Sequence, residues 1–414
     1  MYPLKVDKCI LNFLGKPLII HQIEMAMKAG IKDYVLIGNP LNIGALKIAC
    51  DQISTKIQYA IQETPNGMAG ALLAAEDMIN NEEIIIVNPN DLFDQVVYTQ
   101  ILEERRKVNC HSYIAARKVE SYFPGGYLIV NDNLELLGIQ EKPEIGKEPS
   151  NLVNIVVHLH TEPKLLLSQI KKTKSLQDDV YEQAITMIAK EAGRVRVVPY
   201  EGRWIAIKYP WHILDAIEYF LGAAKKGRIS RTAKISEGAT VENKVIIDEN
   251  AKVMKGAIIK GPCYIGKNTI VGNYALIRDF SHIGNNCTIG YSTEVKHSYI
   301  GDNCLFHSNY IGDSIIEGNC LFGDGSITAN LRFDKKNIKI SVNAIEVDTG
   351  KNKLGSIMGE NSSVGVGCMI MPGVRIGHGS TIGPGIVLHK DTEPYSSVIL
   401  KQEHVIKRAK PLSQ

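Results

Sequence analysis

The fold is decided by the stretch Val253-Met-Lys-Gly-Ala-Ile-Ile259-Lys-Gly-Pro-Cys-Tyr-Ile265-Gly-Lys-Asn-Thr-Ile-Val271-Gly-Asn-Tyr-Ala-Leu-Ile277, in which an aliphatic residue returns every six positions. The same spacing continues on both sides, at Ile235, Val241, Ile247, Ile283, Ile289, Val295, Val364, Ile370, Ile376, Ile382 and Leu388. A helix repeats its buried face every 3.6 residues and a strand every 2, so a period of six predicts short strands separated by corners. Three such strands complete one triangular coil, and stacked coils bury their aliphatic edges against each other. We therefore predict a parallel β-helix.

Composition narrows the function classes. A chain of 414 residues is expected to hold two or three domains, at about 100 to 200 residues each. Its 47 basic and 44 acidic residues leave a net charge of +3, and no Lys/Arg run indicates a nucleic-acid surface. The N-terminus has no signal-peptide pattern, and no apolar run approaches the roughly 18 residues of a membrane span. We expect a soluble, cytoplasmic protein that binds neither nucleic acid nor membrane.

The eight cysteines form no C-x-x-C pair, so the sequence gives no sign of a metal site or a disulfide framework. Five of them lie four residues after an aliphatic position of the repeat: Cys263, Cys287, Cys304, Cys320 and Cys368. A coil needs a small inward side chain at that point, and a free cysteine behaves as a small hydrophobe. We expect these five to pack rather than to react.

The first half of the chain has a different pattern. Helical segments at residues 17–29 and 67–79 alternate with apolar strands at residues 34–37 and 84–87. This alternation predicts an α/β domain with a Rossmann-like, mostly parallel sheet and helices on both faces. An amphipathic helix from Trp211 to Lys226 ends at Gly227, a typical helix stop, and the repeat of six starts soon after. The expected domains are therefore residues 1–226 and 227–414.

Four segments in the first half follow one another in the order found in a known family. They are Lys8-Cys-Ile-Leu-Asn-Phe-Leu-Gly-Lys-Pro17, Gln62-Glu-Thr-Pro-Asn-Gly67-Met-Ala-Gly-Ala-Leu72, Asn90-Asp91 and Gly138-Ile-Gln-Glu141-Lys-Pro143. They resemble segments of sugar-phosphate nucleotidyltransferases, which join a sugar 1-phosphate to a nucleoside triphosphate and release pyrophosphate. Such a site must neutralise crowded phosphate charge with Mg²⁺, lysine and backbone N–H groups.

The resemblance implies roles for individual residues. Asp91 would hold Mg²⁺ and Lys8 would face phosphate, Gln62 and Gly67 would read the uracil edge, and Gly126, Glu141 and Asn154 would touch the sugar. Simpler interpretations remain open for some of them. Asp91 follows a strand and could cap a turn, and Gln62 and Asn154 taken alone are ordinary polar loop residues.

Two departures from the family affect this half. The family begins with a strand and a G-x-G-T-R-x-x-P loop around the triphosphate, whereas this sequence starts at Met1-Tyr2-Pro3-Leu4. That loop acts through pre-organised backbone dipoles, and loss of a central strand exposes a sheet edge. The second departure is Ala206 in Trp204-Ile-Ala206-Ile-Lys208, where many relatives carry a metal-binding Asp. We expect either a true start upstream of Met1 or a degenerate binding scaffold.

The repeat of six breaks between Val295 and Phe322. The break contains Cys304-Leu-Phe-His307-Ser-Asn-Tyr310-Ile-Gly-Asp313, followed by Gly323-Asp-Gly-Ser-Ile-Thr-Ala-Asn330-Leu-Arg-Phe-Asp-Lys-Lys336. These segments resemble the H-x-x-Y-x-G-D and G-x-G-T-I-x-x-N motifs of glucosamine-1-phosphate N-acetyltransferases. Those enzymes are left-handed β-helices and form the C-terminal half of bifunctional UDP-N-acetylglucosamine enzymes. The N-L-R-x-D variant most resembles their archaeal branch.

Acetyl transfer to an amine requires a base, and histidine titrates near neutral pH, so His307 is the candidate base. A sugar phosphate requires convergent cations, for which the matching residues are Arg278, Lys296 and Lys336, together with the Tyr310 hydroxyl. The resemblance further implies that Asn330 stabilises the reacting acetyl group or the amine, and that Lys401 meets the phosphates of acetyl-CoA. A lone histidine at a corner is otherwise usually solvated. Lys336 has Lys335 and Lys339 nearby, so a solvated charged loop is an alternative interpretation of this residue.

The loop of residues 331–355 interrupts a coil, and such insertions in solenoids often form the ligand face. The resemblance implies a homotrimer with sites between chains. The function it implies is N-acetylation of glucosamine 1-phosphate, or of galactosamine 1-phosphate, coupled to uridylyl transfer from UTP. Two alternatives stay open: a single-activity nucleotidyltransferase with an oligomerising β-helix, and a non-catalytic regulatory or assembly subunit. The sugar epimer and the choice between UTP and dTTP are not determined by the sequence.

Overall fold

The computed structural model describes residues 1–191 and 193–408, and the chain divides into two compact units. The α/β unit comprises Asp7–Leu11 and Lys16–Ile207. The β-helix unit comprises Met1–Val6, Asn12–Gly15 and the chain from Lys208 onward. This grouping differs from a single boundary at residues 226–227, because helix α7 (His212–Ala223) and two N-terminal segments group with the coils.

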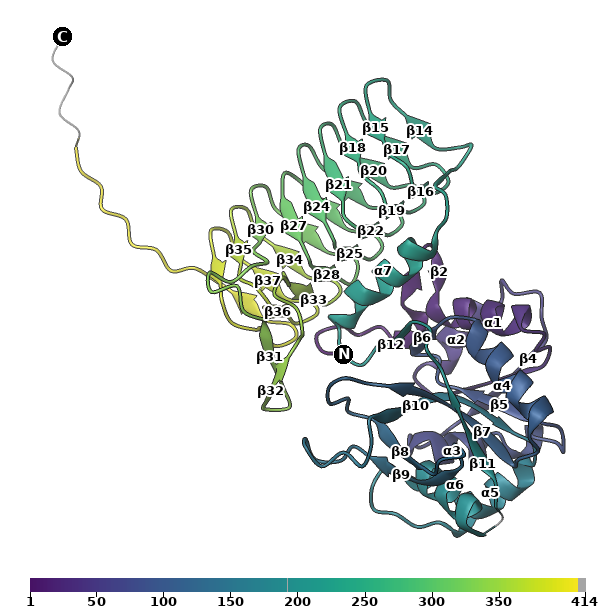
Figure 1. Ribbon diagram of the computed structural model, residues 1–414. Coiled ribbons are helices and arrows are strands. Elements are labelled where there is room, and N and C mark those ends of the chain that lie inside the picture. The colour runs from purple at the N-terminus through teal and green to yellow at the C-terminus, as the bar shows by residue number, and fades with distance from the viewer. Residues whose placement is uncertain (192, 409–414) are drawn as a thin grey trace. The chain divides into compact units, whose positions relative to one another are not determined.

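The α/β unit contains the helices and strands that the alternating pattern predicts (Figure 1). Its helices are α1 Leu18–Lys28, α2 Ile43–Cys50, α3 Gly67–Ala74, α4 Val96–Lys107, α5 Pro163–Lys172 and α6 Val180–Glu191, with 3₁₀ turns η1 Lys8–Ile10 and η2 Glu76–Met78. Its strands are β2 Lys16–Pro17, β3 Tyr34–Gly38, β4 Ile57–Ile61, β5 Ile84–Val87, β6 Asp91–Phe93, β7 Ser112–Lys118, β8 Gly126–Val130, β9 Leu136–Glu141, β10 Leu152–His160, β11 Val195–Pro199 and β12 Trp204–Ala206. The four predicted segments correspond to α1, β3, α3 with η2, and β5.

The main sheet has the order β11-β7-β10-β8-β9, and β5 also pairs with β10. The expected α/β class is confirmed, but the sheet is mixed rather than mostly parallel. The nine-residue strand β10 runs antiparallel to β5, β7 and β8, and β8 and β9 form an antiparallel pair. A short connection joins β8 and β9 into a hairpin, whereas β10 meets β5 and β7 from distant parts of the chain.

Helices cover both faces of this sheet. Alternate residues of β7 point to opposite faces, so Ile114 packs with α5 and α6, and Tyr113 packs with α4. Strands β3 and β4 form a separate parallel pair. Although β5 is entirely aliphatic, all four of its residues are only half-buried. In the described part of the chain, β5 is recorded as pairing with β10 alone.

The β-helix unit contains three parallel sheets, one for each side of the coil (Figure 1). The first sheet contains β13 Arg228–Ile229, β16 Val245–Ile247, β19 Cys263–Ile265, β22 His282–Ile283, β25 Tyr299–Ile300, β28 Ile315–Ile316, β33 Ile357–Met358 and β36 Arg375–Ile376. The second contains β14 Lys234–Ile235, β17 Lys252–Val253, β20 Ile270–Val271, β23 Thr288–Ile289, β26 Leu305–Phe306, β29 Leu321–Phe322, β34 Ser363–Val364, β37 Thr381–Ile382 and β39 Ser397–Val398. The third contains β15 Thr240–Val241, β18 Ile258–Ile259, β21 Leu276–Arg278, β24 Glu294–Lys296, β27 Tyr310–Gly312, β30 Ile327–Thr328, β35 Met369–Ile370 and β38 Val387–Leu388. The predicted parallel β-helix is confirmed.

The interior of the coils is filled by the residues of the six-residue repeat. From Ile247 to Ile382 these aliphatic residues are completely buried, and all five predicted packing cysteines are buried and free. Corners use left-handed backbone, often at asparagine, which tolerates positive φ. Side-chain hydrogen bonds of 3.0 to 3.2 Å run from coil to coil, with each amide donating to the next one in the series Asn268, Asn286, Asn303 and Asn319.

The coils shorten where the repeat breaks. In regular coils, paired residues such as Val241 and Ile259 lie 18 positions apart. At the break, Val295 pairs with Ile311, and partners there lie 16 positions apart. The shortening moves the corner residues relative to the strands. After β30 the chain forms an antiparallel hairpin of β31 (Lys339–Val342) and β32 (Ile345–Asp348), which interrupts the coils.

The N-terminal segments and α7 attach to the coils within the β-helix unit. Glu317 accepts hydrogen bonds from the backbone N–H groups of Lys5 and Val6 at 2.8 and 2.5 Å. Strand β1 (Asn12–Phe13) is followed by Leu14, whose N–H donates to His282 Nε2 at 3.1 Å. Lys351 pairs with Asp215 of α7 at 2.7 Å. These contacts explain why α7 groups with the coils.

Candidate functional site

The outward face of the third sheet presents the predicted phosphate-binding cations. In β21, β24 and β27 the central residues are completely buried: Ile277, Val295 and Ile311. Because side chains alternate along a strand, the residues on either side of each central residue face outward. Arg278 pairs with Lys296 in the next coil, and Lys296 pairs with Gly312 in the coil after that. The register therefore brings Arg278 and Lys296, two of the predicted phosphate-binding residues, next to each other.

Arg278 is held by two carboxylates. Its Nη2 lies 2.6 Å from Glu294 Oε1, and its Nη1 contacts Asp279 Oδ2. A guanidinium has five N–H donors in a planar fork, so these pairs fix its plane and leave donors for a further oxygen ligand. The side chain keeps 28% of its exposure, which suits a residue that meets a ligand from solvent.

Asp313 lies at the centre of the site. Its carboxylate accepts from Lys296 Nζ at 2.7 Å, from His297 Nδ1 at 2.8 Å and from Asn330 Nδ2. Burial alone would raise the pKa of this carboxyl, but the hydrogen bonds from His297 and Lys296 hold the pKa below its usual value. Asp313 is therefore a charged anchor for three side chains from neighbouring coils.

His297 bridges two carboxylates. Its Nδ1 contacts Asp313, and its Nε2 lies 2.8 Å from Oε1 of Glu218 on α7. Burial alone would lower the pKa of this imidazole, but the contacts with Asp313 and Glu218 raise the pKa to about 9. Contact with His297 in turn lowers the pKa of Glu218. The arrangement is an imidazolium between two carboxylates.

Tyr310 and Asn330 meet above Gly312. The Asn330 amide donates from Nδ2 to the Tyr310 hydroxyl at 3.3 Å, as well as to Asp313. A Cβ at Gly312 would lie 2.7 Å from the Tyr310 oxygen and 2.8 Å from Asn330 Nδ2. Glycine is thus required for the two side chains to converge. Both hydrogen bonds are donated by Nδ2, so Asn330 Oδ1 points away from Tyr310 and Asp313.

His307 lies at the corner that leads into β27, three residues before Tyr310. Its backbone N–H donates to Asn309 Oδ1 at 2.8 Å, and its carbonyl accepts from Thr293 Oγ1 at 2.8 Å. Its side chain is exposed. The backbone is therefore fixed while the imidazole stays accessible to a ligand, as a base requires.

The structure does not bring the other two predicted cations to this cluster. Lys336 is exposed in the loop before β31, where its backbone N–H donates to Asp334. Lys401 is exposed in the segment after β39. Their proposed contacts with sugar phosphate and coenzyme A phosphates stay predictions.

Sequence reasoning missed three residues of the cluster: Asp313, His297 and Glu218. Asp313 is the last residue of the quoted H-x-x-Y-x-G-D motif, and its place in that motif was a signal that went unused. His297 directly follows Lys296 and was a second available signal. Nothing in the sequence spacing connects Glu218 with either, because it lies on α7.

In the α/β unit, the residues predicted to touch sugar lie together. Gly126 pairs with Glu141 across the β8–β9 hairpin. A Cβ at Gly126 would lie 3.0 Å from Glu141 Oε2 and 3.6 Å from Asn154 Cβ. The missing side chain at Gly126 therefore keeps a space between Glu141 and Asn154.

The predicted nucleobase loop also has a defined geometry. Gln62 donates from Nε2 to the Gly67 carbonyl at 3.0 Å and to Asn66 Oδ1 at 2.6 Å. Gly67 has φ of +77°, and a Cβ there would lie 1.8 Å from Asp178 Oδ1. With its nitrogen bound inside the loop, Gln62 keeps its carbonyl oxygen as the acceptor for a ligand.

The predicted phosphate and metal residues are neighbours. Burial lowers the pKa of Lys8, while the charges of Asp7 and Asp91 act in the opposite direction. Asp91 is buried, with Trp204 Nε1 donating to its Oδ2 at 3.2 Å. Ala206 pairs with Asp91 across β12 and β6, so a methyl group stands beside the carboxylate.

We tested whether these residues suit Mg²⁺. Over residues 1–191 and 193–408, no group of three or more His, Cys, Asp or Glu side chains is arranged to hold a metal ion. Mg²⁺ in nucleotide sites usually takes only one or two carboxylates and fills its shell with phosphate oxygens and water. Asp91 fits that role as a single carboxylate ligand. Ala206, where many relatives carry a metal-binding Asp, supplies no second carboxylate.

Asn154 is backed by a buried chain of hydrogen bonds. His158 lies 2.6 Å from Asn154 Oδ1 and 2.7 Å from the Tyr181 hydroxyl, and His160 lies 3.1 Å from that hydroxyl. Ser112 completes the chain at 2.8 Å from His160. Burial lowers the pKa of both histidines, so they are neutral at physiological pH. A neutral network fixes the Asn154 amide without adding charge to the sugar site.

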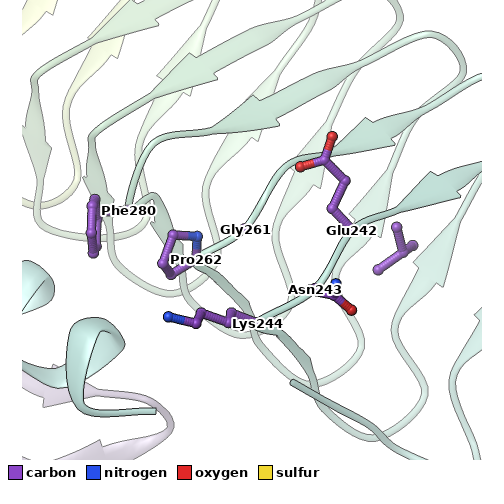
Figure 2. A pocket seen from close by; sticks show the side chains of 7 residues that line it. Glu242, Asn243, Lys244, Gly261, Pro262 and Phe280 are labelled. Atoms are coloured by element: carbon purple, nitrogen blue, oxygen red, sulfur yellow. The ribbon is translucent and has the colours of Figure 1, made fainter. Parts of the chain in front are cut away.

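One surface hollow is lined by residues of the early coils (Figure 2). It occupies the corner between the third and first sheets in the early coils. Its lining residues are Val241, Glu242, Asn243, Lys244, Gly261, Pro262 and Phe280. None of the predicted site residues is among them.

No helix within the described ranges is long and apolar enough to cross a membrane.

Comparison with known proteins agrees with both halves. Residues 2–205 match the nucleotidyl transferase family model, and residues 244–279 match six repeats of the bacterial transferase hexapeptide model, typical of left-handed β-helices. A bifunctional sugar-1-phosphate nucleotidylyltransferase/acetyltransferase of Sulfurisphaera tokodaii is 32% identical over 386 residues, covering 93% of this chain and 92% of that protein. The bifunctional protein GlmU of Methanocaldococcus jannaschii is 32% identical over 413 residues, covering 97% and 95%. The chain therefore belongs to the family of bifunctional sugar-1-phosphate nucleotidylyltransferase/acetyltransferases.

Proposed function

We propose that the β-helix unit transfers an acetyl group from acetyl-CoA to the amino group of glucosamine 1-phosphate or of galactosamine 1-phosphate. The observation that carries the proposal is the convergence of Lys296, Tyr310 and Asn330 on the Asp313 side of the third sheet, next to Arg278. The accessible imidazole of His307 completes the set.

His307 acts as the general base. It accepts a proton from the amino group as the nitrogen attacks the thioester carbonyl, so that the C–N bond forms and the C–S bond breaks. Coenzyme A leaves as the thiol after taking up the proton. An accessible imidazole with its backbone fixed by Asn309 and Thr293 can meet the amine without rearrangement of the coil.

Arg278 and Lys296 bind the sugar phosphate. Arg278 is paired with Asp279 and Glu294, and Lys296 is paired with Asp313, so these groups together carry no net positive charge. Directional N–H donors then contribute more to phosphate recognition than total charge does. The Tyr310 hydroxyl lies on the same face and can bond a sugar hydroxyl.

The α/β unit then joins the acetylated sugar phosphate to UTP. Mg²⁺, when bound at Asp91, would neutralise charge on the triphosphate. Lys8 faces the phosphates, Gln62 reads the uracil edge, and Glu141 and Asn154 contact the sugar on either side of Gly126. The proximity of Lys8 to Asp91 and of Glu141 to Asn154 supports these assignments.

The β-helix unit forms a homotrimer in this proposal. Large side chains on its coils and loop are strongly exposed: Tyr274, Tyr291 and Phe333. Exposed aromatic residues of this kind often mark association surfaces. Light scattering at several protein concentrations would test it, and a monomeric mass throughout would refute it.

The decisive experiment incubates the protein with glucosamine 1-phosphate, acetyl-CoA, UTP and Mg²⁺ and identifies the sugar products by mass spectrometry. UDP-N-acetylglucosamine supports both activities. N-acetylglucosamine 1-phosphate alone supports the β-helix assignment and refutes uridylyl transfer. A parallel reaction with galactosamine 1-phosphate determines the epimer. If no product forms with either sugar, the proposed function is wrong.

His307→Ala tests the base directly. Acetylation should fall by at least about a hundredfold, since general base catalysis contributes roughly 10²–10⁴-fold. The exposed His389 in the same unit provides the control, and His389→Ala should keep full activity. Undiminished acetylation by His307→Ala would rule out His307 as the base.

A further inference from the structure

The β-helix site depends on a buried carboxylate that does not itself face the ligand side. Only 4% of the Asp313 side chain is exposed, against 14% for Lys296. Its two oxygens divide their partners, with Oδ1 receiving His297 and Oδ2 receiving Lys296 and Asn330. The orientation of Asp313 therefore sets the positions of two predicted ligand-binding side chains at once.

His297 fixes that orientation from behind. It approaches Asp313 Oδ1 at 2.8 Å, while Glu218 of α7 lies 2.8 Å from its other nitrogen. Both His297 and Asp313 lie at corners with positive φ, 45° and 47°, a backbone region in which Asp and His are enriched, so both residues suit these corners. The two ring nitrogens of an imidazolium point to opposite sides, so one ring can contact a carboxylate on each side.

Other charged groups surround this chain. On the coil side His297 faces Asp313 and, through it, Lys296. On the helix side it faces Glu218, and the Lys351–Asp215 pair also lies at α7. The pKa of Glu218 is lowered mainly by its contact with His297, and the charge of Lys351 acts in the same direction, so this carboxylate is ionised opposite His297.

We propose that Glu218, His297 and Asp313 form a carboxylate–imidazolium–carboxylate chain that positions Lys296 and Asn330 for acetyl transfer. The proposal deepens the proposed function and rests on it. Asp313, His297 and Glu218 are positioning residues and touch no reacting atom. Helix α7 is thereby a structural part of the acetyl-transfer site.

The chain has a directional consequence. Asp313 and Tyr310 both bind Nδ2 of Asn330, so its carbonyl oxygen is the atom left to meet the ligand. A carbonyl oxygen accepts a hydrogen bond, which suits the N–H of the substrate amine and not the oxyanion of the acetyl group. Asn330 therefore orients the amine.

Glu218→Gln is the sharpest test, because it alters the end of the chain farthest from the ligand. With glucosamine 1-phosphate, KM should rise on the order of tenfold, as expected for loss of a charge-assisted hydrogen bond, while KM for acetyl-CoA stays unchanged. Glu249→Gln is the matched control, since it makes the same change of residue in the β-helix unit and breaks the ion pair with Lys267, which lies outside the chain. Equal kinetics for the two variants would refute the positioning role.

His297→Asn supplies a pH readout that a merely structural role would not produce. Asparagine tolerates the positive φ at this position. Below pH 9 the imidazolium is present, so KM of the variant for the sugar phosphate should exceed that of the wild type. Above pH 9 the two should converge. Substrate titration cancels in this ratio, and a ratio that is constant from pH 7 to 10 would overturn the proposal.

Histidine NMR separates failure of the chain from failure of the proposed function. In ¹⁵N-histidine-labelled protein, the resonance absent from His297→Asn should titrate near pH 9, move to lower pH in Glu218→Gln, and stay in place in Glu249→Gln. Titration near 6.5 in an enzyme that acetylates would overturn the chain alone. Titration near 9 in a protein that acetylates neither sugar would overturn the proposed function, and with it the positioning role.

Discussion

Gly312→Ala tests whether the convergence of Tyr310 and Asn330 matters for acetyl transfer. The new Cβ would lie 2.7 Å from the Tyr310 oxygen, 2.8 Å from its Cε1 and 2.8 Å from Asn330 Nδ2. Carbon contacts are optimal near 3.5 to 4.0 Å, so both side chains must move by roughly 0.7 Å or more. A displacement of about 1 Å at a reaction site can lower the rate about a hundredfold.

The stability cost should be small by comparison. The atoms in the way are ends of side chains on an outward face, so the overpacking cost should lie near the low end of the usual range, about 1 kcal/mol. We therefore expect kcat/KM for acetyl transfer to fall by about 10- to 100-fold, with a thermal midpoint only a few degrees lower.

The assay follows release of the coenzyme A thiol, with the thermal midpoint measured on the same preparations. Gly367→Ala is the control, because Gly367 has φ of +65° and no atom within 4 Å of its Cβ position. It adds backbone strain of the order of 1 kcal/mol without touching the site. If Gly312→Ala retains wild-type kcat/KM, or if the control loses as much activity, the reasoning about Gly312 is wrong.

Three further predictions concern the core, the pH dependence and the metal site. Ile277→Ala removes a completely buried side chain of the repeat and should cost about 2–5 kcal/mol in urea unfolding, and a loss below about 1 kcal/mol would contradict the packing account. Burial, helped by neighbouring carboxylates, raises the pKa of Glu182 to about 7, so its stabilising contribution is lost as pH rises from about 4.5 through 7. Glu182→Gln should therefore raise the thermal midpoint at pH 8 and not at pH 4, and equal midpoints of variant and wild type at pH 8 would refute it. Ala206→Asp places a second carboxylate beside Asp91, so it should lower the midpoint without Mg²⁺ and restore it with Mg²⁺, whereas an Mg²⁺-independent midpoint would contradict that geometry.

Much of the candidate acetyl-transfer site was predictable because it lies where the repeat fails. The residues between Val295 and Phe322 showed both shortened spacing and chemically capable side chains, and the coils there are indeed shorter. Register then follows from the period, so Arg278 and Lys296 had to be neighbours. Lys336 and Lys401 lie outside the regular coils, where no period determines position, and the structure leaves both exposed.

The α/β unit shows what a local pattern cannot specify. Alternation of apolar residues indicates a strand and its buried face, but not the direction of its neighbour. The antiparallel placement of β10 between β7 and β5 depends on contacts between distant segments. The buried chain from Ser112 to Asn154 likewise joins β7, β10 and α6, which the sequence keeps far apart.

The sequence by itself determined the β-helix, its buried cysteines and the coil that carries the site. It could do so because each coil packs against coils of similar sequence. The fixed spacing therefore determines which residue of the next coil lies beside each residue. Only the tertiary structure decided that Glu218 of α7 reaches His297, that Asp313 gathers Lys296 and Asn330, and that the N-terminal segments group with the coils. Those contacts arise where non-repeating segments pack onto the solenoid, and their geometry depends on three-dimensional packing that no spacing along the chain encodes.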